Sequence, residues 1–260
     1  MIGHRGAAGC APENTLAGLR KAKELGCRWV EIDVRFTADG QLILLHDDRL
    51  ERTTNGRGKA ASMPLAAVRR YDTGHRFGDA FRGERVPTLA EAVEVLSELG
   101  IGANIELKAA RGRAAETGAA TAALLFRMWP SHLPPPLISS FLPEALLAAQ
   151  ACAPSIPRSV LFRAVPGNWR VRAEKLGCVT IHADHHCLHP ALVAEIREAG
   201  YALLTYTVND AVRALTLFDW GVTSVFSDVP HIICAAAEAA RQPAAADLSP
   251  TEVPRQGAVR

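Results

Sequence analysis

The chain has 260 residues, 48% hydrophobic and 22% charged, a balance typical of a globular protein that can bury one core of barrel size. Its formal net charge of +2 gives no reason to expect nucleic acid or an anionic membrane as a partner. No apolar run approaches the roughly 20 residues that span a bilayer, so we expect no stable membrane association.

The six cysteines are scattered and form no C-x-x-C pair, which favours reduced thiols over a disulfide framework. The N-terminus lacks the basic and apolar regions of a signal peptide. These two features predict a cytoplasmic protein. A strand that begins at residue 2 is unusually early, so the true N-terminus stays open. The sequence does not predict the oligomeric state.

The N-terminal part predicts a short strand, a helix and a hairpin. Residues 2–6 resemble the end of a strand, and Asn14 or Pro12 opens a helix that closes at Gly26. Two apolar, β-branched runs at 30–36 and 41–46 then flank the dipeptide Asp-Gly, a hairpin signal.

Side chains alternate across the first hairpin strand, so Glu31 and Asp33 share one face while its apolar residues share the other. A two-residue Asp-Gly turn pairs residues whose numbers sum to about 79. This register places His46 beside Asp33.

Residues 48–86 are rich in Arg, Gly and Asp and predict an insertion, after which Thr88 and Glu91 form a capping box. Strands and helices then alternate, with Asn209 and Asp228 expected as helix caps. The expected strands are 103–107, 137–141, 158–162, 179–184, 202–208 and 224–227.

Nine strands are one more than a (β/α)8 barrel needs. The short turn forces the second hairpin strand to run antiparallel, because parallel strands need a crossover of a dozen or more residues. We therefore predict an α/β fold, a TIM barrel over residues 1–240 with the 48–86 insertion over its mouth. An open doubly wound sheet is the alternative, and 241–260 reads as a loose tail.

Polar residues interrupt the predicted strands at their C-terminal ends, where TIM-barrel active sites lie: His4, Arg5, Glu31, Asp33, Glu106 and Lys108. Three carboxylates at one barrel mouth would repel one another unless a cation binds them. Oxygen ligands favour Mg²⁺ or Ca²⁺, with Mn²⁺ as a further candidate. The alternative is a buried layer of ion pairs.

A dication with Arg and Lys would form an electrostatic cradle for a phosphate. Two histidines, His4 and His46, can act as base and acid at neutral pH. This set of residues predicts hydrolysis of a phosphodiester.

These segments resemble the motifs of the glycerophosphodiester phosphodiesterases of the cytosolic bacterial type, in order and spacing, over roughly residues 2–235. They are His4-Arg5-Gly6, Pro12-Glu13-Asn14-Thr15, Glu31-Ile32-Asp33-Val34, His46-Asp47, Val86-Pro87-Thr88-Leu89, Glu106-Leu107-Lys108, Ser140-Phe141, Tyr206-Thr207-Val208-Asn209 and Ser227-Asp228-Val229-Pro230.

The resemblance implies a divalent metal on Glu31, Asp33 and Glu106 and phosphate contacts from Arg5 and Lys108. It implies that a glycerophosphodiester, a small-molecule substrate, yields sn-glycerol 3-phosphate and an alcohol, with His4 preferred as base and His46 as acid. Attack by water and attack by the glycerol 2-hydroxyl both stay open, as does the identity of the alcohol.

The chain departs from the family at Tyr206, where Trp is common, and at Thr223-Ser224, where Asp-Gly is common. Tyr206 is expected to pack on the substrate's glycerol. Among supporting residues, Glu13 either orients Arg5 or suits the start of a helix. His182, in a histidine-rich segment, is expected to touch substrate or a ligand-holding residue, with a second metal site as the weaker reading.

Two other functions remain open on the same barrel. The first is phospholipase D-like hydrolysis of a lysophospholipid or sphingolipid, which needs an apolar rim that the insertion could supply only through Leu65, Val68, Tyr71, Phe77 and Phe81. The second is a barrel that binds phosphodiesters without catalysis.

Overall fold

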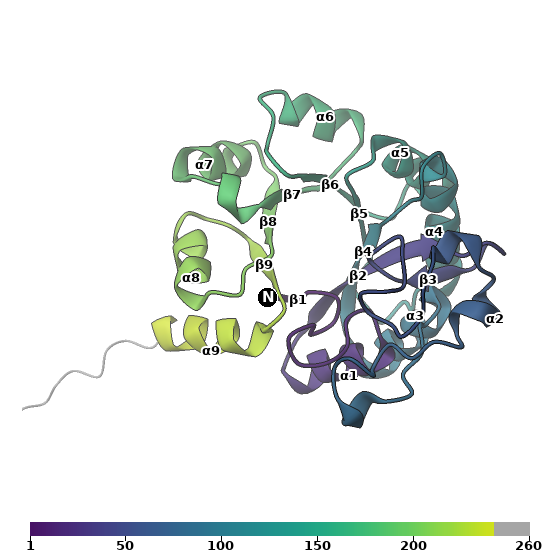
Figure 1. Ribbon diagram of the computed structural model, residues 1–260. Helices are drawn as coiled ribbons and strands as arrows, with labels where there is room; N and C mark the ends of the chain where they lie inside the picture. Colours follow the sequence, from purple (N-terminus) through teal and green to yellow (C-terminus); the bar gives the residue numbers. More distant parts are fainter. Residues whose placement is uncertain (242–260) are drawn as a thin grey trace, which may run out of the picture.

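Eight parallel strands close into a barrel with helices around its outside (Figure 1), which confirms the predicted TIM barrel. The structure is a computed structural model and describes residues 1–241. β1 pairs with both β2 and β9, and these pairings close the ring. The strands are β1 (Ile2–Gly3), β2 (Trp29–Phe36), β3 (Leu42–Leu44), β4 (Gly102–Leu107), β5 (Leu137–Ser140), β6 (Arg158–Phe162), β7 (Thr180–Asp184), β8 (Ala202–Tyr206) and β9 (Ser224–Ser227).

Helices follow the strands of the barrel and pack on their outward-facing apolar side chains. On β2, Val30, Ile32 and Val34 are fully buried in this layer, while Glu31 and Asp33 alternate with them and lie on the other face of the strand. The helices are α1 (Leu16–Glu24), α2 (Leu65–Val68), α3 (Leu89–Leu99), α4 (Ala114–Met128), α5 (Pro143–Cys152), α6 (Trp169–Lys175), α7 (Pro190–Glu198), α8 (Ala211–Asp219) and α9 (Pro230–Arg241).

The hairpin differs from its predicted register by one residue. β2 and β3 pair antiparallel with Val34 opposite Leu44, so the paired numbers sum to 78 rather than 79. The loop has three residues instead of two, and its last residue, Gly40, takes a left-handed φ of 75°. Leu45 therefore donates its N–H to the Asp33 carbonyl, at 3.0 Å, and His46 lies one residue beyond it.

Helix ends follow the predicted capping chemistry in part. Thr88 and Glu91 form the expected capping box of α3. The α1 cap is Thr15, whose side chain accepts from the N–H of Gly18, so neither Asn14 nor Pro12 opens that helix. Asp210, not Asn209, caps α8.

The insertion is more ordered than its composition indicates. Residues 48–86 form α2 and two single helical turns, Ala60–Ser62 and Asp79–Phe81, around a small core against β3. Ile43, Leu50 and Val68 are fully buried in that core.

No helix within residues 1–241 is both long and apolar enough to cross a membrane. Except for Arg241, which ends α9, the predicted tail lies outside the described residues.

Candidate active site

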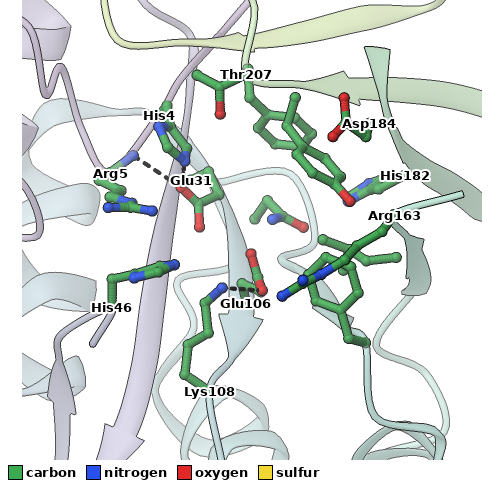
Figure 2. Close-up of a pocket in the computed structure, with 15 residues that line it drawn as sticks. His4, Arg5, Glu31, His46, Glu106, Lys108, Arg163, His182, Asp184 and Thr207 are labelled. Atoms are coloured by element: carbon green, nitrogen blue, oxygen red, sulfur yellow. Dashed lines mark hydrogen bonds and ion pairs between the residues drawn. The ribbon is translucent and has the colours of Figure 1, made fainter. Parts of the chain in front are cut away.

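A cavity of about 350 Å³ opens at the C-terminal ends of the barrel strands (Figure 2). Most of the residues predicted from the strand ends line it or lie directly beneath it. Those that line it are His4, Arg5, Glu31, His46, Glu106, Lys108, His182 and Tyr206. Side chains from separate strands therefore converge on one space, as active sites of this fold require.

Three buried carboxylates form the floor of this site. Oxygens of Glu31, Asp33 and Glu106 lie within 4.8 Å of one another. Burial raises the pKa of Glu31 and of Glu106, and the charge of Asp33 raises both further. Oxygen Oε1 of Glu31 is buried and accepts no hydrogen bond from any described residue. This crowded all-oxygen cluster with an unsatisfied acceptor fits a hard divalent cation.

Two cationic side chains flank the carboxylates. The Nε of Arg5 lies 3.2 Å from Asp33, and the Nζ of Lys108 lies 2.5 Å from Glu106 and 3.4 Å from Asp33. Burial alone would raise the pKa of Asp33, but the charges of Lys108 and Arg5 outweigh it and hold that pKa low. Arg5 also donates its backbone N–H to Glu31 at 2.9 Å. Both cations border the space beside the carboxylates, where an anion can bind.

His4 is oriented from behind by an acidic residue. Its Nδ1 lies 2.6 Å from an oxygen of Asp228, which in turn accepts a hydrogen bond from Asn209 at 2.7 Å. The Nε2 of His4 is left facing the cavity, 3.9 Å from Glu31. Burial opposes a charge on this ring, but the bond to Asp228 and the charge of Glu31 outweigh it and raise the pKa of His4.

His46 has a comparable arrangement on the insertion side. Its Nδ1 lies 2.6 Å from Asp47, so its Nε2 is also free toward the cavity. The buried Arg35 donates to the His46 carbonyl at 2.6 Å and fixes the chain where it leaves β3. Burial lowers the pKa of His46, although the charge of Asp33 opposes this effect.

Arg52 of the insertion ties the two halves of the site together. It donates two hydrogen bonds to Asp47, at 2.7 and 3.1 Å, and two to Glu13, at 2.6 and 2.8 Å. Glu13 also accepts from Arg5 at 2.9 Å. One guanidinium thus braces both the partner of His46 and the partner of Arg5. Two roles were predicted for Glu13. It contacts Arg5, as the first of them requires, and it lies before the Thr15 cap rather than within the first turn of α1.

Asn14 holds the central carboxylate in place. Its amide donates to the Asp33 side chain at 2.8 Å and accepts from the Asp33 N–H at 3.0 Å. To do so it adopts a left-handed φ of 54°, which asparagine tolerates better than most residues. This geometry explains why Asn14 cannot start α1.

Aromatic and basic side chains form the wall opposite His46. The rings of Phe141 and Tyr206 meet edge to face at 6.1 Å, and the Tyr206 hydroxyl donates to the Phe162 carbonyl at 2.8 Å. Lys108 and Arg163 lie 5.8 and 5.9 Å from the centre of the Phe141 ring. This wall offers an apolar platform with cations at its edge.

His182 lines the cavity with Asp184, as the alternation along their strand predicts. Its ring is fully buried against Phe226, and burial lowers its pKa to about 3, so it is neutral. Asp184, His185 and His186 come close enough to hold an ion, but Arg213 lies 3.5 Å from His185 and its charge opposes a cation there.

Sequence reasoning missed the residues that orient the predicted ones. The sequence predicts Asp228 and Asn209 as helix caps and Asn14 as a helix start, and it places Arg52 only within the insertion. The motifs of Asn14, Asn209 and Asp228 lie at Pro12–Thr15, 206–209 and 227–230, but only the fold brings these residues and Arg52 behind those that line the cavity. The catalytic, phosphate-binding and metal-binding roles of the lining residues stay predictions.

Comparison with known proteins gives consistent matches over nearly the whole chain. The model of the glycerophosphoryl diester phosphodiesterase family matches residues 4–232. A glycerophosphodiester phosphodiesterase of Caldanaerobacter subterraneus is 30% identical over 234 residues, 90% of this chain and 95% of the relative. One from Bacillus subtilis is 32% identical over 248 residues, 89% and 84% of the two chains.

The solved structure of an Oleispira antarctica phosphodiesterase in complex with the product sn-glycerol-3-phosphate is also similar. It superposes with a TM-score of 0.89 at 43% identity, covering 91% of this chain and 96% of the other. Sequence and fold therefore point to the same group of proteins.

Proposed function

The chain belongs to the glycerophosphoryl diester phosphodiesterase family and is an enzyme of that class, and from this premise we propose how its own residues carry the reaction. The substrate is a small glycerophosphodiester, which is cleaved to sn-glycerol 3-phosphate and an alcohol. The observation that carries the proposal is the convergence of three buried carboxylates, two cations and two acid-braced histidines on one cavity.

Glu31, Asp33 and Glu106 would hold the divalent cation, Mg²⁺, Ca²⁺ or Mn²⁺. Bound there, the ion would neutralise the carboxylates and draw negative charge from the phosphate oxygens. Arg5 and Lys108 bind the same phosphate from the sides, and their own partners Glu13 and Asp33 keep them aimed at it. The site is thus complementary to the charge that builds up on the phosphate during the reaction.

His4 accepts the proton of the attacking hydroxyl at Nε2. Asp228 holds its Nδ1 proton, which fixes the tautomer with a free Nε2. A cation bound to Glu31 would compensate one of the charges that raise the pKa of His4, and so would favour the neutral ring that a base must have.

His46 donates a proton from Nε2 to the departing alcohol. Arg5 and Lys108 lower the pKa of this ring, and a bound phosphate compensates their charges, so the protonated form becomes easier to reach. Asp47 stabilises that form through its 2.6 Å contact with Nδ1. The alcohol therefore leaves on the side of the insertion.

The enzyme is proposed to work in the cytoplasm, where its six free cysteines would stay reduced.

Tyr206 and Phe141 are proposed to pack on the glycerol carbons at the opposite wall. His182, neutral and buried, is proposed to support that wall.

The test is release of glycerol 3-phosphate and choline from glycerophosphocholine by wild type and His46→Ala. We expect His46→Ala to lower kcat by about 10²–10⁴-fold. A substrate with a p-nitrophenol leaving group needs no protonation, so the same variant should lose much less on it. An equal loss on both substrates would remove His46 from the role of acid.

A further inference from the structure

The charge of this chain is unevenly distributed. Residues 48–86 hold nine arginines and lysines against five acids, a charge of +4, which leaves −2 for the rest of a chain whose total is +2. Four of the nine cations pair with acids. The other five are exposed and, within residues 1–241, have no carboxylate within ion-pair distance: Arg57, Lys59, Arg70, Arg76 and Arg85. The insertion therefore offers a basic surface that the balance of the whole chain conceals.

Two aromatic side chains lie outside the small core of the insertion. Leu65, Val68 and Tyr71 pack in or against that core, so they are not free to form an apolar rim. Phe77 and Phe81 do not belong to it. Their rings pack on each other edge to face at 5.2 Å, and Phe77 is 40% exposed. The insertion thus presents an aromatic surface that its own packing does not use.

The loop that carries this aromatic pair, residues 74–83, is closed at its base. The Asp72 carboxylate accepts hydrogen bonds from the N–H groups of Gly74 and Gly83, both at 2.8 Å. Gly74 packs so closely on Phe81 that a Cβ at position 74 would lie 1.7 Å from the Phe81 carbonyl oxygen. The two rings are therefore held in a preformed loop, and little conformational entropy is lost when they bind a partner.

Arginines accompany the aromatic pair. A cavity beside the loop, of about 540 Å³, is lined by Arg57 and Arg76. Another, of about 530 Å³, is lined by Arg82 and Arg85 together with Phe81. Exposed aromatic rings among arginines fit a bilayer that contains anionic lipids, because the rings enter the boundary between head groups and acyl chains while the guanidinium groups bind lipid phosphates.

The loop lies at the end of the barrel that carries the active site. The cavity lined by Phe81 and Arg82 is also lined by Leu16, the first residue of α1. Because α1 follows β1, it begins where the barrel strands end, and the active-site cavity opens at that same end. A surface that contacts the loop therefore lies near the mouth through which substrate enters.

We propose that loop 74–83 and the arginines beside it dock the enzyme reversibly on the surface of a bilayer that contains anionic phospholipids. A glycerophosphodiester is a glycerophospholipid that has lost both acyl chains. A reaction that hydrolyses acyl esters must therefore supply it, and that reaction takes place at a bilayer. Docking places the enzyme where its substrate is released. The docking does not depend on the proposed reaction, so binding is measured separately from hydrolysis.

The experiment measures co-sedimentation of the purified full chain with large unilamellar vesicles of phosphatidylcholine, alone or with about 30% phosphatidylglycerol. Wild type should bind the anionic vesicles and not the neutral ones, and raising the salt from about 0.05 to about 0.5 M should weaken binding about tenfold. Arg76→Gln should weaken it about fivefold, and Phe77→Ala about threefold. Both variants should hydrolyse soluble glycerophosphocholine within about twofold of wild type.

Phe126 and Arg127 on α4 are the matched control. Phe126 is 70% exposed, and Arg127 beside it is exposed and, in the described part of the chain, has no carboxylate within ion-pair distance. They repeat the combination of an exposed ring and a free cation outside the insertion. Phe126→Ala and Arg127→Gln should therefore bind the anionic vesicles as wild type does.

No binding to the anionic vesicles at low salt would overturn this inference and leave the proposed function standing. Binding that Arg76→Gln and Phe77→Ala leave unchanged, or that the control variants weaken equally, would also overturn it. Binding to heparin without binding to vesicles would make the insertion a surface for a soluble acidic partner instead. Wild type that binds vesicles but does not hydrolyse glycerophosphocholine would refute the proposed function and not the docking.

Discussion

Asp228→Asn tests how the His4 ring is held. The substitution keeps the size of the side chain but removes the charge that lies 2.6 Å from Nδ1 of His4. The amide can still accept one hydrogen bond, so the loop and its bond to Asn209 should persist. The change therefore acts on the histidine rather than on the fold.

The size of the effect follows from the contact. A hydrogen bond to a charged partner contributes about 1.5–3 kcal/mol, which is about 10- to 150-fold in rate when it is lost at the transition state. The His4 and Asp228 side chains are 17% and 29% exposed, so solvent screens the pair only in part. We expect kcat to fall by that range, because protonated His4 forms as the reaction proceeds.

The pH profile gives the second readout. Asp228 raises the pKa of His4, and a base must be neutral, so activity rises with pH through that pKa. Asp228→Asn lowers the His4 pKa, and the acid limb of kcat/KM should move to lower pH. Asp210→Asn is the matched control, because Asp210 only caps α8 and asparagine caps equally well. An unchanged acid limb with kcat within twofold of wild type would refute the role given to Asp228.

Two further predictions address the residues that orient the site, and a third addresses the cation. Arg52→Lys can make only part of the four hydrogen bonds to Asp47 and Glu13, and should lower kcat about tenfold in a steady-state assay. Asn14→Ala should lower the free energy of unfolding by about 2–4 kcal/mol in a denaturant titration, through lost bonds to Asp33 and a strained φ. A divalent cation at about 100 times its Kd should raise the Tm of metal-stripped protein by about 5–10 °C, and Glu31→Gln should abolish that rise.

Each of these has a matched comparison. Arg49→Lys alters an arginine whose one ion-pair partner among residues 1–241 is Glu51, and a loss equal to that of Arg52→Lys would make the Arg52 effect nonspecific. Asn14→Gly also loses the hydrogen bonds to Asp33, but glycine adopts the left-handed φ without strain. This variant should therefore be less destabilised than Asn14→Ala, and the reverse order would contradict the role given to the backbone. A Tm rise that persists in Glu31→Gln would place the cation elsewhere.

Local patterns were sufficient for the barrel and for the residues that line its mouth. Alternation along β2 placed Glu31 and Asp33 on one face, and the shared edge of parallel strands placed them with Glu106. These inferences depend on the two-residue alternation of side chains and on the direction of each strand, and both can be inferred from segments of a few residues. The hairpin register failed by one residue because Asp-Gly is compatible with both two- and three-residue loops, and the left-handed Gly40 selects the longer one.

The bracing residues could not be predicted in the same way. Asp228 lies 224 positions from His4 in the chain, and Arg52 lies 39 positions from Glu13. Asp, Asn and Thr near a helix start look like caps in sequence whether or not they cap. Only the closed barrel, which pairs β1 with β9, shows that Asp228 serves His4 instead.

Whether the three buried carboxylates hold a cation that hydrolysis needs is tested most directly by measuring hydrolysis and bound ion in the same samples. Protein stripped with EDTA would be titrated with Mg²⁺, Mn²⁺ or Ca²⁺, with glycerol 3-phosphate release from glycerophosphocholine and the ion content recorded at each step. We expect activity to return in proportion to one bound ion per chain, and Glu106→Gln to bind the ion weakly and stay inactive. Full activity in samples that hold no ion would contradict it.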